Sequence, residues 1–329
     1  MKIPMLVLTI AVSGAIAGWA VKPTEAESAG GNVKITALGT HDGEVCRRDR
    51  AILFEDPKGA TLLFDAGRSV LGPSDPRLGK VDVVLLSSVH GDHLGDRIPP
   101  KLNAGTCAKP KTSVSTKPNS NTANIAAKKQ SKVIVGGQMR GFLRKKVVAA
   151  GGSAKQVQIL RFGGKRTVKG VKIAIVPVVH SNGISPAFLD KGLADALKPD
   201  GLTAYTGPDN GYILTFTNGL VVYLSADTGH TSDMETIVRR YYKAKLAIVN
   251  MGDIFSMGPE EAAWAVNELI KPNAVIPTHA NEAATKGGKL DPKSKTAKFK
   301  SLVKGIPVHL PLSGKTMQFD SNARCVAGC

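Results

Sequence analysis

Histidine and aspartate residues gather in this sequence where predicted strands end. The densest group is Ser88-Val89-His90-Gly91-Asp92-His93, directly after an apolar run over residues 81–86 that predicts a buried strand. His180, Asp227 and His279 each follow a further strand-like segment. Imidazole and carboxylate groups that loops deliver from a rigid sheet favour zinc or another first-row metal over calcium. The sequence therefore predicts a metal site made of His90, Asp92, His93, His180, Asp227 and His279.

The elements that must position these residues are short strands with helices between them. Thr217-Asn218-Gly219 separates apolar runs over residues 212–216 and 220–224 and predicts a hairpin. Gly258-Pro259-Glu260-Glu261 predicts the first turn of a helix that ends at about residue 270. Other strand-like runs cover residues 33–38, 51–54, 61–64, 173–179 and 274–277, and residues 97–130 predict loops with a short helix. With no internal repeat and no long linker, the pattern predicts an α/β sandwich around one core.

The motifs around these strands resemble a known superfamily. Phe64-Asp65-Ala66-Gly67, followed by Ser88-x-His90-x-Asp92-His93-x-Gly95-Asp96, is similar to the metallo-β-lactamase-fold hydrolases, whose signature is His-x-His-x-Asp-His. The resemblance continues through His180, residues 225–229 and residues 276–279, and it is strongest for the simple single-domain, lactonase-like branch. It implies a four-layer αββα sandwich in which the site lies at the open edge between two β-sheets. We expect one such domain over residues 31–329.

The resemblance also implies two metal positions. The first would use Ser88, His90 and His180, the second would use Asp92, His93 and His279, and Asp227 would bridge them. A metal-bound hydroxide would be the nucleophile, because zinc lowers the pKa of bound water to about 7. Asp92 is also the candidate catalytic residue.

Ser88 departs from the superfamily pattern, which has histidine there. A neutral hydroxyl is a poor zinc ligand beside imidazole, so the first position keeps only His90, His180 and the shared Asp227. The second position keeps all of its protein ligands. We therefore expect one tightly bound zinc ion at the second position and a weak or absent ion at the first.

Positive charge is concentrated in one part of the chain. The 44 Lys and Arg exceed the 26 Asp and Glu, which gives a formal net charge of +18. Residues 97–189 contain no Asp or Glu and carry 18 Lys and Arg. This acid-free segment predicts either attraction of an anionic small-molecule substrate or a basic face that aids solubility. Specific nucleic-acid binding is not expected, because aromatic residues make up only 5% of the chain, and binding to a membrane surface is a weaker alternative.

The N-terminus predicts export. Lys2 precedes an uncharged stretch over residues 5–20 that is shorter than the ~20 residues of a spanning helix, which is typical of a signal peptide over residues 1–20 with cleavage between 20 and 30. An uncleaved anchor is the alternative. A periplasmic or secreted protein can form disulfides, and Cys46, Cys107, Cys325 and Cys329 allow three full pairings, all of which stay open.

Several other polar residues allow either a structural or a functional interpretation. Asp65 is expected to orient a ligand histidine, with the capping of a turn as the alternative. Asn182 and Asn281 either touch substrate or hydrogen-bond within loops. The remaining histidines, His41, His230 and His309, are expected to be structural, with His41 and His230 as alternative replacements for the ligand lost at Ser88.

The leading hypothesis is an exported metal-dependent hydrolase that acts on a small anionic ester, lactone or phosphodiester. A non-catalytic metal- or ligand-binding protein and a β-lactamase are the alternatives. The sequence does not predict an oligomeric state.

Overall fold

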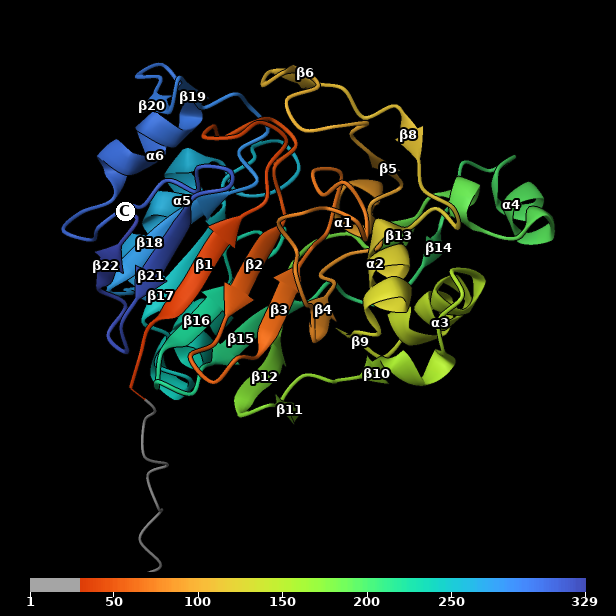
Figure 1. Cartoon of the computed structure of the whole chain (residues 1–329), viewed down its shortest axis with the longest axis horizontal. Coiled ribbons are helices and arrows are strands. Elements are labelled where there is room, and N and C mark those ends of the chain that lie inside the picture. The colour runs from red at the N-terminus through yellow and green to blue at the C-terminus, as the bar shows by residue number, and fades with distance from the viewer. Residues whose placement is uncertain (1–29) are drawn as a thin grey trace, which may run out of the picture.

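Two β-sheets packed face to face form the centre of the molecule (Figure 1). The computed structural model describes residues 30–329, so the predicted signal peptide lies outside the described residues. The larger sheet has eight strands in the order β10-β9-β4-β3-β2-β1-β21-β22. In chain order these are β1 (Val33–Ala37), β2 (Ile52–Glu55), β3 (Thr61–Phe64), β4 (Val83–Leu85), β9 (Lys132–Val135), β10 (Val157–Ile159), β21 (Thr316–Phe319) and β22 (Cys325–Ala327).

The second sheet has six strands in the order β11-β12-β15-β16-β17-β18. They are β11 (Lys165–Val168), β12 (Val171–Val176), β15 (Gly211–Thr215), β16 (Val221–Leu224), β17 (Leu246–Asn250) and β18 (Ala274–Thr278). Strands β15 and β16 pair antiparallel, as the turn signal at residues 217–219 predicts. In both sheets, parallel pairs lie next to most of the loops that carry the candidate site residues: β3 with β4, β16 with β17, and β17 with β18.

A continuous apolar core lies between the sheets. It includes Phe54 and Leu62 of the larger sheet and Tyr212 and Leu224 of the smaller one, all buried. The Tyr212 hydroxyl reaches across to the larger sheet, within 2.7 Å of the Leu86 carbonyl oxygen and 2.9 Å of that of Ile134. Because a buried phenol needs a hydrogen-bond partner, this contact fixes how the two sheets sit against each other.

Helices cover the outer face of each sheet (Figure 1). Helices α2 (Asn121–Lys129) and α3 (Met139–Ala149) pack on the larger sheet. Segments η3 (Met234–Tyr241), α5 (Pro259–Trp264), η4 (Ala265–Ile270) and α6 (Lys295–Leu302) pack on the smaller one. This arrangement confirms the predicted four-layer αββα sandwich. It also confirms the predicted helix to residue 270, since η4 continues α5 without a break.

Short elements fill the connections. They are α1 (Gly91–Leu94), β5 (Arg97–Ile98), β6 (Gly105–Thr106), β7 (Lys109–Pro110), β8 (Val114–Ser115), η1 (Ala154–Gln156), β13 (Gly183–Ile184), η2 (Pro186–Phe188), α4 (Lys191–Leu197), β14 (Ala204–Tyr205), β19 (Thr285–Lys286) and β20 (Lys289–Leu290). Among residues 30–329, no helix has the length and apolar character needed to cross a membrane.

Disulfides join Cys46 to Cys107 and Cys325 to Cys329. This is one of the three pairings that the sequence left open. The first bond joins segments that are 61 residues apart in the chain.

Candidate metal centre

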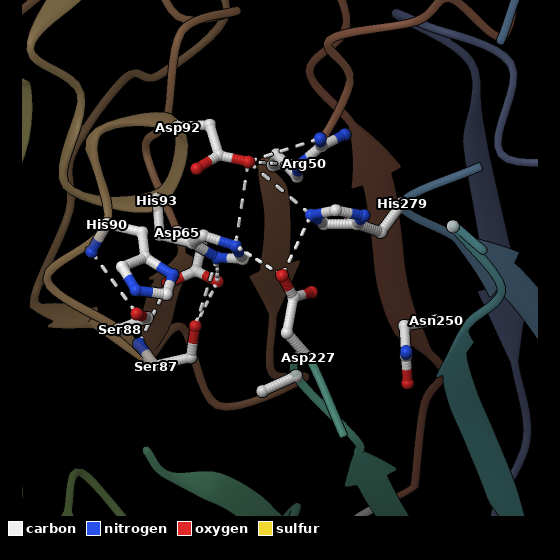
Figure 2. Close-up of polar contacts among 12 residues, drawn as sticks. Arg50, Asp65, Ser87, Ser88, His90, Asp92, His93, Asp227, Asn250 and His279 are labelled. Carbon is white, nitrogen blue, oxygen red and sulfur yellow. Dashed lines mark hydrogen bonds and ion pairs between the residues drawn. The ribbon is translucent and has the colours of Figure 1, made fainter. Parts of the chain in front are cut away.

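The candidate ligands come from loops and turns at the ends of four strands. His90, Asp92 and His93 lie in and beside α1, shortly after β4. His180 follows β12, Asp227 follows β16, and His279 comes directly after β18. Figure 2 shows the polar ends of Asp92, His93, Asp227 and His279 turned toward one another. The fold thus brings together residues that are far apart in the sequence.

The second metal position is compact. Asp227 Oδ2 lies 3.0 Å from His93 Nε2 and 3.0 Å from His279 Nε2. Asp92 Oδ2 lies 3.5 Å from His279 Nε2 and 3.8 Å from His93 Nε2. Asp92, His93 and His279 each offer a ligand atom, and these atoms all lie within 4.8 Å of one another. Four donors from three separate segments therefore converge on one small volume.

The first metal position is more open. The rings of His90 and His180 meet edge to face with centroids 5.2 Å apart, and both side chains are half-buried. Ser88 is buried behind them, where its hydroxyl accepts the backbone N–H of His90 at 3.2 Å and donates to Asn182 Oδ1 at 3.3 Å. The hydroxyl is therefore held by protein groups.

Asp65 orients His93. Its Oδ2 lies 2.7 Å from His93 Nδ1, and its carboxylate also accepts the Ser87 N–H at 2.9 Å and the Ser87 hydroxyl at 2.6 Å. When Nδ1 carries the proton for this contact, the lone pair of Nε2 is available to bind a metal ion between His93 and Asp227. The geometry agrees with the ligand-orienting role expected for Asp65.

Three turns at the site adopt backbone conformations that non-glycine residues avoid. Asp65 has φ 42°, Ala226 has φ 56° and His279 has φ 53°. Left-handed conformations of this kind cost energy and collect at functional sites, where the surrounding structure imposes them. Here they follow β3, β16 and β18 and turn side chains toward the centre.

The protonation chemistry of the cluster suits a cation. Burial would lower the pKa of His93, but the charges of Asp227, Asp92 and Asp65 outweigh it and hold that pKa well above its usual value. Burial would raise the pKa of Asp227, but His279 and His93 hold it well below its usual value. The carboxylates therefore draw a proton onto His93, and a metal ion would take the place of that proton.

Unpartnered polar atoms point the same way. Asp227 Oδ1 and His279 Nδ1 are buried without a hydrogen-bond partner, and His279 Nε2 has only the carboxylates of Asp227 and Asp92 near it, at 3.0 Å and 3.5 Å. Buried polar atoms normally have partners, and those that lack one indicate an ion or a water. Two imidazoles and two carboxylates form a donor set that fits zinc or another first-row metal.

A cavity of about 410 Å³ opens beside the cluster. It is lined by Arg47, Arg48, Arg50, Arg68, His90, Asp92, His180, Ser181, Asp227, Phe255, His279 and Asn281. We did not expect the four arginines from the sequence. The available signal was the basic run Arg47-Arg48-Asp49-Arg50 after a cysteine.

The arginines divide into two pairs. Arg50 Nη2 donates to Asp92 Oδ2 at 3.2 Å and to Asn281 Oδ1 at 2.6 Å, and Arg68 pairs with Asp96 at 2.5 Å. Arg47 and Arg48 form no ion pair within residues 30–329. Burial and the like charges of Arg68, Arg47 and Arg50 lower the pKa of Arg48. The cavity lining thus includes two arginines that form no ion pair with a carboxylate of the described chain.

Comparison with known proteins places the chain in a family. A family model described as a beta-lactamase superfamily domain matches residues 60–280. The chain belongs to the beta-lactamase superfamily. It is 30% identical over 227 residues to a UPF0173 metal-dependent hydrolase of Koribacter versatilis, covering 68% of this chain and 77% of that protein. A second UPF0173 metal-dependent hydrolase, of Pelotomaculum thermopropionicum, is 29% identical over 249 residues, which is 76% of this chain and 85% of its own length.

Solved structures share the fold of this superfamily member. Igni18, a metallo hydrolase of Ignicoccus hospitalis, superposes with a TM-score of 0.57 at 21% identity over 88% of this chain and 99% of its own. The protein YhfI of Bacillus subtilis, which has the metallo-β-lactamase fold, gives a TM-score of 0.53 at 14% identity over 88% of this chain and all of its own. The family model and the relatives identify the chain as a metal-dependent hydrolase of the metallo-β-lactamase superfamily, and these structures share its fold.

The remaining histidines of the hydrolase have structural contacts. His41 Nδ1 lies 3.1 Å from Thr40 Oγ1, and the rings of His230 and Trp264 pack at 5.3 Å. His309 packs on Phe319 at 5.4 Å. None of the three is among the residues that line the cavity, which agrees with the structural role expected for them.

Proposed function

We propose that this hydrolase cleaves a small anionic ester, lactone or phosphodiester with the help of one tightly bound zinc ion. The main support is a cavity of about 410 Å³ that is lined by four arginines and lies beside the cluster of Asp92, His93, Asp227 and His279. The cavity has the size of a small-molecule site, and its charge favours an anion.

The cluster supplies the place for the chemistry. A zinc ion held by Asp92, His93, Asp227 and His279 would act as a Lewis acid and lower the pKa of a bound water to about 7. Asp65 holds His93 in the orientation that this requires. The fit of these four side chains supports tight binding there, while the loss of imidazole at Ser88 supports weaker binding at the first position.

Asp92 is the group best placed to move a proton. Its side chain is 30% exposed, compared with 2% for His93 and 6% for Asp227, so it reaches the cavity most directly. Burial would raise the pKa of Asp92, but the charges of His93, Arg50 and His279 hold it well below its usual value. An ionised Asp92 can accept a proton from a water molecule in the cavity and orient that water toward the substrate.

Arg47 and Arg48 would bind the anionic group of the substrate. They lie at the cavity and have no carboxylate partner in the described chain, so a ligand anion would be their ion-pair partner. The acid-free segment at residues 97–189 contributes no Lys or Arg to the lining of the cavity. The attraction of substrate is therefore assigned to the arginines at 47 and 48.

Export is also proposed. It is supported by the apolar stretch at residues 5–20 and by the pairing of all four cysteines in disulfides, which persist in oxidising compartments. Fractionation of cells that produce the full chain, with N-terminal sequencing of the product, tests it.

Paired substrates test the function. Purified protein is offered carboxylated and neutral esters that share one leaving group, together with a lactone and a phosphodiester, before and after chelation. We expect hydrolysis of the anionic members, loss of activity on chelation, and recovery on addition of zinc. Activity that survives chelation, or metal binding without any turnover across the panel, would contradict the proposal.

A further inference from the structure

Asp209, which lies just before β15, has a buried carboxylate that the proposed function does not use. Asp209 is fully buried, and neither of its carboxylate oxygens has a hydrogen-bond partner. Asn182, also fully buried, has an unpartnered side-chain N–H₂ group. An unpaired carboxylate in the interior is strongly unfavourable unless a cation, a proton or a water meets it. No described side chain forms a hydrogen bond of normal geometry with Asp209, so a proton, a water or a cation must meet its carboxylate.

The loop that carries Asp209 is tied to the end of β4. The backbone N–H of Asn210 donates to the Ser87 carbonyl at 3.0 Å, and the Tyr212 hydroxyl lies 2.7 Å from the Leu86 carbonyl. These contacts set Asp209 against the segment that contains Ser88 and leads into His90. Burial raises the pKa of Asp209 to about 8, although the charge of His93 and the nearby Ser88 hydroxyl lower it in part.

The same loop is tied to the segment that follows His180. The backbone N–H and the hydroxyl of Thr206 both donate to the Asn182 carbonyl, at 3.2 Å and 3.1 Å. Asn182 in turn accepts the Val89 N–H at 3.1 Å through its side chain. Residues 206–210 therefore bridge the two segments that provide the histidines of the first position.

We propose that Asp209 is a ligand of the first metal position, where its carboxylate replaces the imidazole that Ser88 lacks. This inference rests on the metal centre of the proposed function. With His90, His180 and the shared Asp227, it gives the first position two imidazoles and two carboxylates, a set that suits zinc, manganese or iron. Ser88 then supports the ligand, and the first position is a weaker metal site.

Zinc titration of the metal-free full-length protein tests the assignment. Calorimetry with a competing chelator counts the binding events, and elemental analysis of the dialysed protein gives the metal content. We expect a tight and a weaker event in the natural protein. Asp209→Asn should lower the affinity of the weaker event, which belongs to the first position, about 10- to 100-fold. The affinity of the tight event should stay within about twofold. His279→Ala should produce the reverse pattern.

Two further variants keep the test interpretable. Asp190→Asn changes an exposed aspartate outside the cluster and should leave both events unchanged. Ser88→His combined with Asp209→Asn should restore the weaker event, because it returns an imidazole to the first position. Recovery would also show that the Asp209→Asn protein can fold.

The outcomes separate the two proposals. A natural protein that binds one ion up to millimolar zinc, or Asp209→Asn protein that binds two ions like the natural one, would overturn the role of Asp209. If His279→Ala leaves the tight event intact, the metal centre of the proposed function is itself wrong.

Discussion

The two candidate metal positions are built from similar residue types but differ in how the protein holds them. At the second position, Asp227 lies 3.0 Å from both His93 and His279, and Asp65 fixes His93 from behind. At the first position, His90 and His180 meet only edge to face, and no ring nitrogen of either is hydrogen-bonded to a described residue. Metal affinity depends on this second layer of contacts as well as on the ligands themselves.

The electrostatic environments differ in the same direction. Burial lowers the pKa of His90 and of His180, and the charge of His93 lowers each further, although Asp227 raises both in part. The pKa of His93 instead is well above its usual value, because three carboxylates surround it. The second position therefore attracts a positive charge even in the metal-free protein, while the first holds neutral imidazoles.

Replacement of one histidine at each position should reveal the largest difference between the two positions. His279→Ala should lower hydrolysis at least about 100-fold and remove the tightly bound ion, because it deletes a donor of the compact site. His180→Ala should have a smaller effect on both. Metal content and kcat/KM of the two variants are measured side by side, and equal losses would mean that the positions are equivalent.

Loss of the carboxylate behind His93 should weaken only the second position. Asp65→Asn keeps the shape of the side chain but removes the charge that orients His93, and we expect zinc affinity there to fall about 10- to 100-fold. Competition titration measures it. Ser87→Ala, which removes one hydroxyl contact to Asp65, is the milder matched variant, and an equal effect of both would argue that packing rather than charge is responsible.

Substitution of the cavity arginines should change substrate binding without changing either metal position. Arg47→Ala and Arg48→Ala should each raise KM for an anionic substrate about tenfold, because a charge-assisted contact contributes about 1.5 kcal/mol or more. The effect should shrink at high salt.

Exposed lysines provide the control for these arginines. Lys128→Ala and Lys155→Ala lie in the acid-free segment and outside the cavity lining, so KM should stay unchanged. A larger effect from the lysines would indicate that the acid-free segment, rather than Arg47 and Arg48, attracts the substrate.

Restoration of an imidazole at position 88 tests whether the first position limits the reaction, and we expect it to change the rate least. Ser88→His should raise the metal content to two tightly held ions per chain. If the second position performs the chemistry, activity should stay within about tenfold of the natural protein. A much larger gain would show that the natural protein is limited by its first position.

Much of the site follows from local sequence. The apolar run at residues 81–86 predicts the strand that ends beside His90, and strand-like patterns before Asp227 and His279 place those residues at strand ends. These predictions succeed because strand formation and turn chemistry depend on neighbouring residues. The superfamily motif adds the order of the ligands along the chain.

The tertiary structure decided which distant groups meet these ligands. Arg47 and Arg48 reach the cavity although the acid-free segment elsewhere carries the larger charge. The loop that carries Asp209 is hydrogen-bonded to Ser87, and Cys46 pairs with Cys107. Such proximity depends on how loops between strands pack over the sheet edge, and side chains far apart in the chain leave no local pattern. The sequence by itself determined the donors and the elements that present them. Packing decided their charge environment and their partners, because only the folded chain fixes distances between segments.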